Sequence, residues 1–485
     1  MGGMASNPSD APLQILSALE VLEAIARDRT LLSALAEAER NRLMAAAGRV
    51  ASPTEKDLRR ARKAEKKAKE QSRSEADRAL LARTRMQKLR NELVFPTPEP
   101  DEEPGTPAPE RLSEARACYV CKTPYHEVHS FYDSLCRPCG DFNFAKRGQT
   151  ADLRGRVALV TGARVKIGYH AAIKLLRAGA HVIATTRFPR DAASRFAREP
   201  DHLEFRDRLE IHGLELRHTP SVELFARSLL SRLERLDFIV NNACQTVRRP
   251  AAFYRHLLDA ELEGPDALPR LEAGWLRHHL ARAGGAPSHS AALATAPGEL
   301  EDSRIFPAGQ LDADLQQLDL RALNSWRLTL SEVPTIELLE VQLVNAVAPF
   351  VLNARLKPLM VRVPSRDKHV VNVSAMEGQF YKAFKTDRHP HTNMAKAALN
   401  MLTRTSAIDY ARDGIHMNSV DTGWVTDEDP VAFAEKKSRE QGQVFRPPLD
   451  VVDGAARILD PIFDGITTGK HVFGQFLKDY RSVPW

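Results

Sequence analysis

Four cysteines are the residues whose spacing most directly suggests chemistry. They form two Cys-x2-Cys pairs about fifteen residues apart, Cys118 with Cys121 and Cys136 with Cys139. Two such pairs can offer four thiolates in a tetrahedron, which is the ligand set of a closed structural Zn²⁺ site. Two disulfides or a redox pair are the alternative. We expect the metal and a cytoplasmic location, because the chain starts without a secretion signal and clustered cysteines suit a reducing compartment.

A glycine turn near residue 162 suggests a second kind of chemistry, the binding of phosphate. Residues 157–160 are continuously apolar, which indicates a buried strand of a parallel sheet, and the turn TGARVKIG follows directly. A helix beginning at Ile167-Gly168 would point its free N–H groups at the space above the strand, which suits a pyrophosphate. A second strand within 179–184 closes a βαβ unit of the dinucleotide-binding kind.

Further strands and helices must position these residues, and they alternate as a doubly wound fold requires. The predicted strands are 214–216, 237–240, 369–374 and 415–420, and the predicted helices are 220–233, 338–356 and 393–412. The fold class is therefore α/β, with a doubly wound parallel sheet.

Six motifs in this order resemble the short-chain dehydrogenase/reductase family across residues 153–480. They are TGARVKIG, NNAC, VNAVAPF, VVNVSAMEG, MAKAALNMLTRTSA and GIHMNSVDTGWVT. The resemblance implies a Rossmann-type sheet, a nicotinamide dinucleotide cofactor and oxidoreduction of a carbonyl or alcohol.

The resemblance also implies a set of cofactor-binding residues: Thr161, Gly162, Lys166, Ile167, Gly168, Arg187, Asn242, Ala243, Lys396 and Thr426. Lys166 replaces the family's middle glycine, where a side chain crowds the pyrophosphate unless its ammonium binds a phosphate. Arg187 stands where the family places a cation for a 2′-phosphate, so NADP is favoured and NAD is the alternative. Cys244 replaces the glycine of the family's NNAG motif, and we expect a small buried residue there rather than a nucleophile.

The implied catalytic residues match the family only in part. Asn345 and Lys396 match its asparagine and lysine, whereas Thr392 stands where the tyrosine belongs. Ala375 takes the position of the serine, with Ser374 one residue early. A threonine hydroxyl has no accessible pKa near neutrality, so another acid or base is needed.

Three ionisable side chains lie close to Thr392 in the sequence, namely His391, His389 and Tyr381. His391 is the preferred candidate acid or base, because imidazole titrates near neutral pH and this residue adjoins the start of the helix. A surface or capping role is the alternative for His391.

The chain of 485 residues exceeds one ordinary domain. We expect a helical arm with a long basic helix at 1–94, a Pro-rich acidic linker at 95–112, the zinc module at 113–148 and the sheet domain at 149–485. An insertion at 245–333 should emerge at the carboxyl edge of the strands, as a lid, a docking surface or a disordered excursion. The short link to the sheet domain predicts that the zinc module packs against it.

The formal net charge of +6 belongs to one segment. Between Pro53 and Glu92, fourteen Lys and Arg face seven Asp and Glu, so the remaining chain sums to about −1. No aromatic residues are interleaved for base stacking, so a solvated or partner-binding helix is favoured over a nucleic-acid site. The sequence has no run of 18 or more apolar residues, which argues against a membrane span.

Three functions follow, in order of preference. The first is an NADP-dependent oxidoreductase with a non-standard acid or base. The second is a catalytically silent NAD(P)-binding sensor or scaffold that binds a protein through the zinc module or the insertion. The third is nucleic-acid binding through the basic helix. The expected partner is a small-molecule substrate or a protein, and the family resemblance adds a homo-oligomer.

Overall fold

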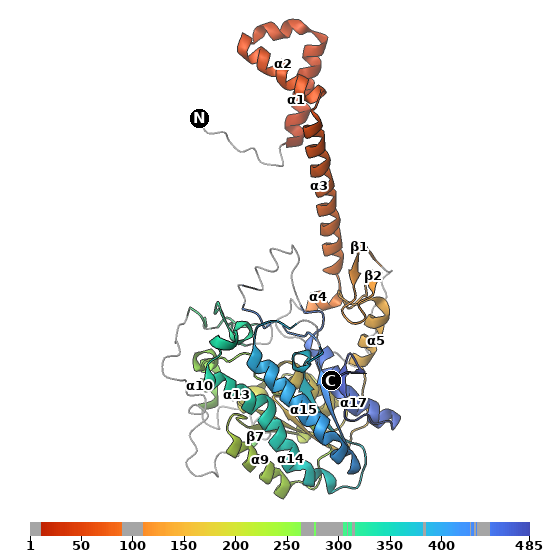
Figure 1. Ribbon diagram of the computed structural model, residues 1–485, viewed down its shortest axis with the longest axis vertical. Coiled ribbons are helices and arrows are strands. Elements are labelled where there is room, and N and C mark those ends of the chain that lie inside the picture. Colours follow the sequence, from red (N-terminus) through yellow and green to blue (C-terminus); the bar gives the residue numbers. More distant parts are fainter. Residues whose placement is uncertain are drawn as a thin grey trace. The chain divides into compact units, whose positions relative to one another are not determined.

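The computed structural model describes residues 11–89, 110–262, 276–277, 304–307, 309–312, 316–381, 385–426, 428–430, 433 and 447–485 (Figure 1). The chain divides into two compact units, Met1–Ala76 and Asp77–Trp485. The division falls inside a helix, whereas the sequence placed the end of the arm at residue 94. Most of the predicted linker and much of the predicted insertion lie outside the described residues.

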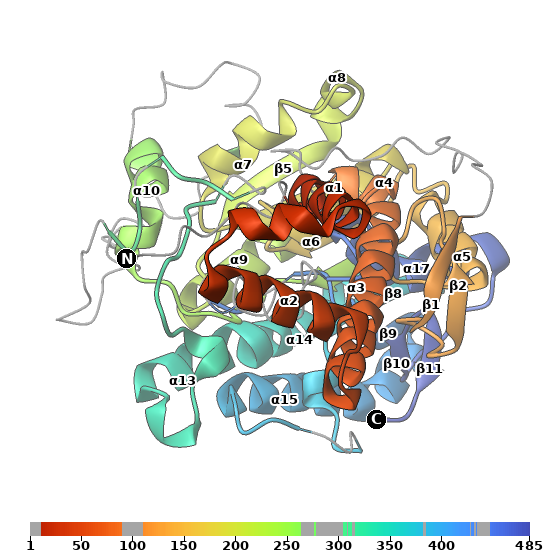
Figure 2. The same ribbon diagram turned by 90° about the horizontal axis from the view of Figure 1, so that it is seen from above.

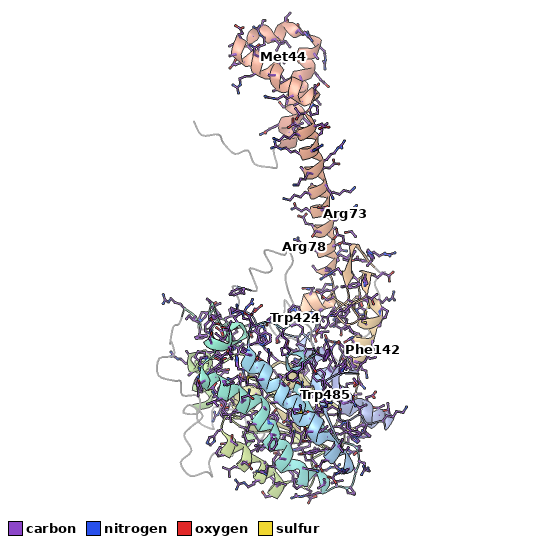
Figure 3. All side chains as sticks on the ribbon, in the orientation of Figure 1. Met44, Arg73, Arg78, Phe142, Trp424 and Trp485 are labelled. Carbon is purple, nitrogen blue, oxygen red and sulfur yellow. The ribbon has the colours of Figure 1, made fainter. Side chains whose placement is uncertain are left out.

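The first unit is a helical arm. Helices α1 (Ala11–Arg27) and α2 (Glu37–Ala51) form a hairpin, and α3 (Glu55–Leu81) follows. No described side chain from Leu13 to Ala76 is buried, and Figure 3 shows Arg73 projecting outward from α3. The arm therefore has no hydrophobic core of its own within the described residues.

The long basic helix expected in the arm is shorter than the predicted arm. Helix α3 ends at Leu81, and α4 (Arg85–Leu89) follows a turn. The turn forms because the backbone N–H groups of Arg85 and Met86 donate to the carbonyls of Ser130 and Phe131 (3.2 and 3.1 Å). These tertiary hydrogen bonds replace the bonds that would continue α3.

The four-cysteine module consists of the antiparallel strands β1 (Arg111–Ala117) and β2 (Pro124–Glu127) and helix α5 (Arg137–Arg147). Phe131 and Tyr132 are buried in its core. Phe142 is 44% exposed and packs edge-on against Tyr480. The core of the module is continuous with side chains of the sheet domain, so the predicted packing of the two is confirmed.

A mostly parallel sheet forms the centre of the second unit. Its described strands, in spatial order, are β11 (Arg481–Val483), β10 (Phe476–Lys478), β9 (Ile415–Asp421), β8 (Lys368–Ser374), β6 (Phe238–Asn241), β3 (Val157–Thr161), β4 (His181–Thr186), β5 (Leu209–Gly213) and β7 (Leu276–Arg277). Only the β10–β11 pair is antiparallel. The chain order reverses beside β3, which leaves a crevice at the carboxyl ends of β3 and β6.

Helices cover both faces of this sheet (Figures 1 and 2). Their bounds are α6 (Lys166–Arg177), α7 (Pro189–Phe196), α8 (His202–Phe205), α9 (Thr219–Arg232), α10 (Arg255–Leu262), α13 (Thr335–Gln342), α14 (Ala348–Val361), α15 (Pro390–Arg412) and α17 (Val451–Thr468). Apolar side chains of α6, α7 and α17 fill one core, and those of α9, α14 and α15 fill the other. The doubly wound α/β fold expected from the sequence is confirmed.

One strand was placed wrongly. The apolar triplet 214–216 predicted a strand, but β5 ends at Gly213, and Leu214 and Leu216 are buried beyond its end. Strand β5 contains Glu210 and His212, which hid it from a search for apolar runs. The Glu210 carboxylate is compensated by Arg232 and His181, so this buried carboxylate is tolerated in the strand.

The continuous helical stretch Thr335–Val361, which includes α13 and α14, is long and apolar enough to cross a membrane by length and composition alone. Half of its most apolar window is buried within the protein. Leu352, Leu356 and Leu359 of α14 belong to one of the two cores of the sheet domain. The apolar character is therefore explained by packing on the sheet.

Candidate functional site

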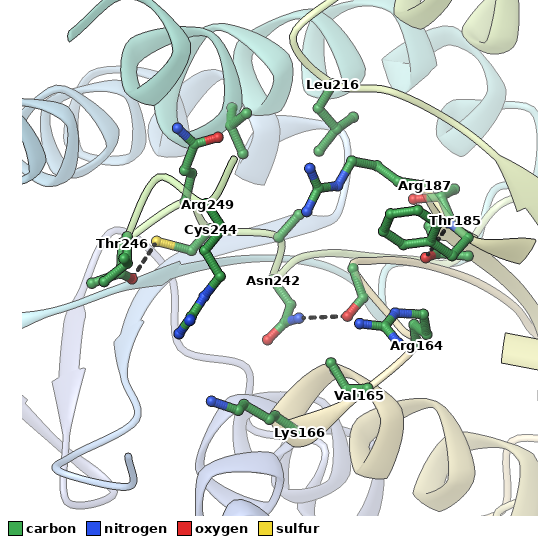
Figure 4. Close-up of a pocket in the computed structure, with 18 of the residues that line it drawn as sticks. Arg164, Val165, Lys166, Thr185, Arg187, Leu216, Asn242, Cys244, Thr246 and Arg249 are labelled. Atoms are coloured by element: carbon green, nitrogen blue, oxygen red, sulfur yellow. Dashed lines mark hydrogen bonds between the residues drawn. The ribbon is translucent and has the colours of Figure 1, made fainter. Parts of the chain in front are cut away.

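A cavity of about 340 Å³ lies at the carboxyl ends of β3, β4 and β6, where the glycine turn was expected to bind phosphate (Figure 4). Its lining includes most of the predicted cofactor-binding residues, namely Gly162, Lys166, Ile167, Gly168, Arg187, Asn242, Ala243 and Thr426. The lining does not include any of the five predicted catalytic residues. The cavity therefore corresponds to the predicted nucleotide site and stops short of the predicted catalytic residues.

The glycine turn is held by close backbone contacts. Gly162 has a φ of +68°, and a Cβ there would lie 2.9 Å from the Cα of Ala243. A Cβ on Gly168 would lie 2.3 Å from both the Asn242 amide nitrogen and the Gly162 carbonyl oxygen. The Asn242 amide donates to the carbonyls of Thr161 and Gly162 (3.1 and 3.3 Å). These residues build the cradle, and only glycine fits at the two turn positions.

Lys166 begins helix α6 with a φ of +56°, a left-handed conformation that the family's glycine adopts without strain. Its ammonium acts on Glu428, which also lines the cavity. Burial raises the pKa of Glu428, but the charges of Lys166 and Arg249 outweigh burial and leave that pKa below its ordinary value. Figure 4 shows Lys166 and Arg249 extending into the same part of the cavity.

Arg187 follows β4 and contacts an aromatic residue of the insertion. Its guanidinium donates to the Tyr254 hydroxyl (2.8 Å) and lies 4.6 Å from the centre of that ring. Burial raises the pKa of the Tyr254 phenol, but the positive charges of Arg187 and Arg249 outweigh this effect, so the pKa lies below its ordinary value. The two side chains form one wall of the cavity.

Other cations around the cavity are neutralised by carboxylates. Arg164 pairs with Asp191 (2.7 Å), and both Arg217 and Arg248 pair with Glu340 (3.0 Å each). Among the described residues, no carboxylate lies within ion-pair distance of Arg187, although its charge helps to lower the pKa of Glu215, which also lines the cavity. The Arg187 guanidinium is thus the cation best placed to take a charge from a ligand.

Lys396 and Asn345 occupy buried positions near the ends of β8 and β6. The Lys396 ammonium donates to the Val373 carbonyl (2.7 Å). Asn345 lies in a π-helical turn, Leu343–Val347, between α13 and α14. Its side chain accepts from the Gln245 N–H (2.7 Å) and donates to the Gln245 carbonyl (3.1 Å), which ties this turn to the segment after β6.

The predicted hydroxyl groups are bonded within the protein. Ser374 donates to the Asn400 side chain (2.6 Å), and Thr392 donates to the His389 carbonyl (2.8 Å). The Thr392 oxygen also lies 3.1 Å from His389 Nδ1. Thr392 and Lys396 are four residues apart on α15, so they share a helix face.

The two histidines near Thr392 have different surroundings. His391 is buried, and its Nε2 lies 3.3 Å from a carboxylate oxygen of Glu337 on α13. His389 immediately precedes α15 with a φ of +43°, and its ring stacks on Trp326 at 3.8 Å. Burial lowers the pKa of His389, although the charge of Glu377 opposes this effect. The structure therefore places His389, and not His391, in contact with Thr392.

A short piece of the insertion, residues 324–328, bridges the segments on either side of the predicted catalytic region. We call it the strap. The N–H of His389 donates to the Leu328 carbonyl (2.8 Å). On the other side, the Asn324 amide donates to the Glu428 carbonyl (2.8 Å), and Arg327 pairs with Asp429 (2.8 Å). This part of the insertion is ordered against the site, as a lid would be.

The four cysteine sulfurs all lie within 4.8 Å of one another. The sulfurs of a tetrahedral Zn–S₄ centre are about 3.8 Å apart, given Zn–S bonds of about 2.3 Å, and Cys121 and Cys136 are 3.6 Å apart. His126 and His129 have other partners, since His126 bonds to the Leu112 carbonyl and His129 accepts from backbone N–H groups. The cluster therefore suits a metal held by thiolates alone.

Sequence reasoning missed several cavity residues, including Arg164, Arg248, Arg249, Tyr254 and Glu428. Arg164 lies inside the glycine turn and the two other arginines follow NNAC after three residues, so their positions were a usable signal. Cys244 was expected to be buried, but it is exposed and lines the cavity. The turn after β6 opens there, so the thiol faces the cavity.

Comparison with known proteins is consistent with this geometry. Residues 156–259 match the model of the short chain dehydrogenase family, and residues 324–450 match a model described as enoyl-(acyl carrier protein) reductase. The doubly wound sheet and the matched segments define the class: the chain belongs to the short-chain dehydrogenase/reductase family.

A similar protein over most of the length is the uncharacterized protein R665 of Acanthamoeba polyphaga mimivirus. It is 32% identical over 370 residues, which cover 73% of this chain and 72% of that protein. Dehydrogenase/reductase SDR family member 13 of Bos taurus is 34% identical over 125 residues, 25% of this chain and 32% of that one. The uncharacterized oxidoreductase YxbG of Bacillus subtilis is 37% identical over 114 residues, 23% of this chain and 38% of that one.

Solved structures with a similar arrangement include a short-chain dehydrogenase from Streptomyces avermitilis. It has 21% identity and a TM-score of 0.39, with 63% of this chain and 83% of that chain covered. An NADPH-bound carbonyl reductase from chicken fatty liver has 19% identity and a TM-score of 0.42, with 69% and 100% covered.

Proposed function

We propose that this chain binds NADP(H) in the cavity and acts as an oxidoreductase on a carbonyl or alcohol. The observation that carries the proposal is Arg187. It lies at the carboxyl end of β4, faces the cavity and has no carboxylate partner among the described residues, while its Tyr254 contact fixes its direction. A 2′-phosphate would give Arg187 an ion pair, and a charge-assisted pair of this kind discriminates against NAD.

The residues of the cradle fit a pyrophosphate. The two glycines leave no side chain between the backbone and the ligand, and the first turn of α6 directs its free N–H groups at the same space. Lys166 adds a cation where the family has a glycine. Lys166 keeps the left-handed backbone conformation of that glycine. The substitution therefore adds a positive charge and introduces backbone strain.

When bound, NADPH supplies a hydride, and the chain must supply a proton and hold the substrate oxygen. Lys396 and Asn345 keep the positions that support the cofactor ribose and the proton path in the family. We assign the proton source to His389, acting through the Thr392 hydroxyl. His389 Nδ1 lies 3.1 Å from that hydroxyl, which shares a helix face with Lys396. Threonine only relays the proton, because its own pKa is too high to release one.

The catalytically silent sensor is the second candidate, and one observation favours it. Ser374 and Thr392 both donate their hydroxyl protons within the protein, and no phenol stands at position 392. In this state the chain binds a nucleotide without presenting a donor to a substrate. The nucleic-acid proposal has no comparable support from the described contacts.

The test separates binding from turnover. Calorimetry with NADPH, NADP⁺, NADH and NAD⁺ should show tighter binding of the two phosphorylated forms. Arg187→Ala should lose that difference, whereas Arg154→Ala should keep it, because Arg154 is an exposed residue paired with Asp152. Equal affinity of the wild type for all four nucleotides would contradict the NADP assignment.

Turnover is tested by NADPH oxidation with a panel of aldehydes and ketones, using Lys396→Ala as the inactive control. Thr392→Tyr restores the family's phenol four residues before the lysine. If the wild type is silent and Thr392→Tyr is active, the sensor proposal is supported. Activity of the wild type that is lost in Lys396→Ala supports the oxidoreductase.

We also propose that the four thiolates of the module hold Zn²⁺ as a structural ion. Elemental analysis of the purified protein should give one zinc ion per chain.

A further inference from the structure

The four-cysteine module contacts both ends of the segment that joins β9 to α17. At the near end, the hydroxyl of Tyr119 accepts a hydrogen bond from the Trp424 N–H (2.8 Å). Tyr119 lies between Cys118 and Cys121, within the first Cys-x2-Cys pair. The fit is close, because a Cβ on Gly423 would lie 3.3 Å from the Tyr119 hydroxyl. Figure 3 shows Trp424 on the side of the domain that carries the module.

At the far end, a buried ionic cluster joins the module to the start of α17. Arg147 of α5 donates to both carboxylate oxygens of Asp450 (2.6 and 2.7 Å) and lies 3.1 Å from Asp453. Tyr132 donates to Asp453 (2.6 Å). These side chains are buried, so breaking one partner would leave an uncompensated charge in the interior. The end of the joining segment is therefore fixed to the module.

The joining segment carries residues of the nucleotide cavity. Thr426 and Glu428 line the cavity. The Trp424 indole donates to the Thr426 carbonyl (3.1 Å), and the Thr426 hydroxyl donates to Glu428 (2.9 Å). A continuous chain of hydrogen bonds therefore runs from Tyr119 through Trp424 and Thr426 to the cavity wall.

The module and the joining segment also share one hydrophobic core. Leu112, Phe131 and Leu135 of the module pack with Val425 and Val452. A metal bound by both Cys-x2-Cys pairs would tie the loops of this small module together. Loss of the ion would loosen the loop between Cys118 and Cys121. The Tyr119 hydroxyl, which accepts the hydrogen bond from Trp424, would move with that loop.

We infer that the four cysteines form a structural Zn²⁺ site that positions Thr426 and Glu428 at the cavity wall, and that Tyr119 is the positioning residue connecting the two. The effect on nucleotide affinity rests on the proposed function, whereas the effect on the segment itself does not. Metal and nucleotide binding are thermodynamically linked, so each strengthens the other by the same factor.

The experiment compares Tyr119→Phe with Tyr125→Phe in the full chain. Tyr125 lies in the same module, but its hydroxyl donates to the Asp133 carbonyl and does not reach the joining segment. Zinc content, NADPH affinity by calorimetry and hydrogen exchange at residues 421–430 are measured for both. Loss of one hydrogen bond should weaken NADPH binding about 3- to 10-fold in Tyr119→Phe. Exchange at the Trp424 amide should become faster, with zinc retained, and Tyr125→Phe should match the wild type in exchange and affinity.

Metal removal supplies a second measurement that needs no variant. Stripping the ion with a chelator should speed exchange at residues 421–430, and adding Zn²⁺ back should restore it. The inference is overturned if the purified protein lacks a stoichiometric metal, or if Tyr119→Phe and metal removal both leave exchange unchanged. If exchange responds as expected but the wild type binds no nicotinamide nucleotide, the proposed function fails and the metal-dependent positioning stands.

Discussion

At position 392, a threonine replaces the phenol on which the family's proton transfer depends, and this single residue makes the pH dependence of the reaction informative. If His389 is the proton source, carbonyl reduction requires its imidazolium. Burial lowers the pKa of His389 below the ordinary 6.5. The rate of NADPH-dependent reduction should therefore be highest at low pH and fall as the pH rises through a value below 6.5, because the imidazolium is lost there.

The measurement is kcat/KM for a carbonyl substrate between pH 5 and 8. His389→Gln should abolish the titration and lower the rate, whereas His391→Gln should keep the profile, because His391 contacts Glu337 and not Thr392. The opposite pattern would return the role of acid to His391, as the sequence suggested.

Lys166 provides a second prediction at the residue scale, since strain and charge can be separated there. Lys166→Gly relieves a left-handed conformation that costs a side chain about 1 kcal/mol. Lys166→Met keeps the strain and removes the charge. If the ammonium contacts the ligand, both variants should weaken NADPH binding about 10-fold, the scale of a lost charge-assisted contact. Only Lys166→Gly should raise the melting temperature, as followed by calorimetry. If Lys166→Met binds NADPH as tightly as the wild type, the Lys166 ammonium interacts with Glu428 and not with the ligand.

The sequence was informative about this site wherever residues are neighbours along the chain. Gly162, Lys166 and Gly168 belong to one turn, and Arg187 follows the next strand, so their roles could be predicted from spacing. Tyr254 and Glu428 approach the same cavity from distant parts of the chain. Their positions depend on how the insertion and the joining segment fold back, which no local pattern encodes.

Among the elements, the strap shows how the insertion acts on the site. Residues 324–328 hydrogen-bond to the start of α15 and to the segment that carries Glu428. Arg327→Ala removes the ion pair with Asp429 and should speed NADPH release about 3- to 10-fold, the value of one half-buried charge pair. Stopped-flow displacement measures the rate. Leu330→Ala is the control, because Leu330 belongs to the insertion and its side chain is 77% exposed. If Arg327→Ala releases NADPH at the wild-type rate, the strap does not hold the segment that carries Glu428.

Element boundaries were predictable where apolar runs coincide with strands, as at β3, β6, β8 and β9. They were not predictable where tertiary contacts decide. Strand β5 accommodates Glu210 because Arg232 and His181 reach it from neighbouring elements. Helix α3 ends at Leu81 because Ser130 and Phe131 offer carbonyls to the next residues. In both cases the deciding partner is remote in sequence.

At the scale of the whole molecule, the two compact units differ in how they are stabilised. The second unit buries three large apolar clusters and a smaller one formed mostly by the insertion. The first has no buried side chain among its described residues. Its basic charge is therefore available for other contacts, and salt-dependent retention on a polyanion column, compared with and without residues 1–76, tests the nucleic-acid hypothesis.

The same asymmetry predicts where the chain can be shortened. A chain of residues 77–485 should keep the melting temperature and NADPH affinity of the full protein, because it removes no buried group. It also retains Asp77, whose carboxylate accepts from the Ser113 N–H (2.8 Å) and from the Ser113 hydroxyl (2.9 Å) of β1. A chain of residues 82–485 loses Asp77 and the buried Leu81. It should be less stable by about 2 to 4 kcal/mol, since a buried leucine and hydrogen bonds to a charged group are lost together. Thermal unfolding of the zinc-loaded proteins measures both differences in stability. Equal stability of the two shortened chains would show that α3 contributes nothing to the module. A large loss of stability in the chain of residues 77–485 would show that the arm stabilises the second unit.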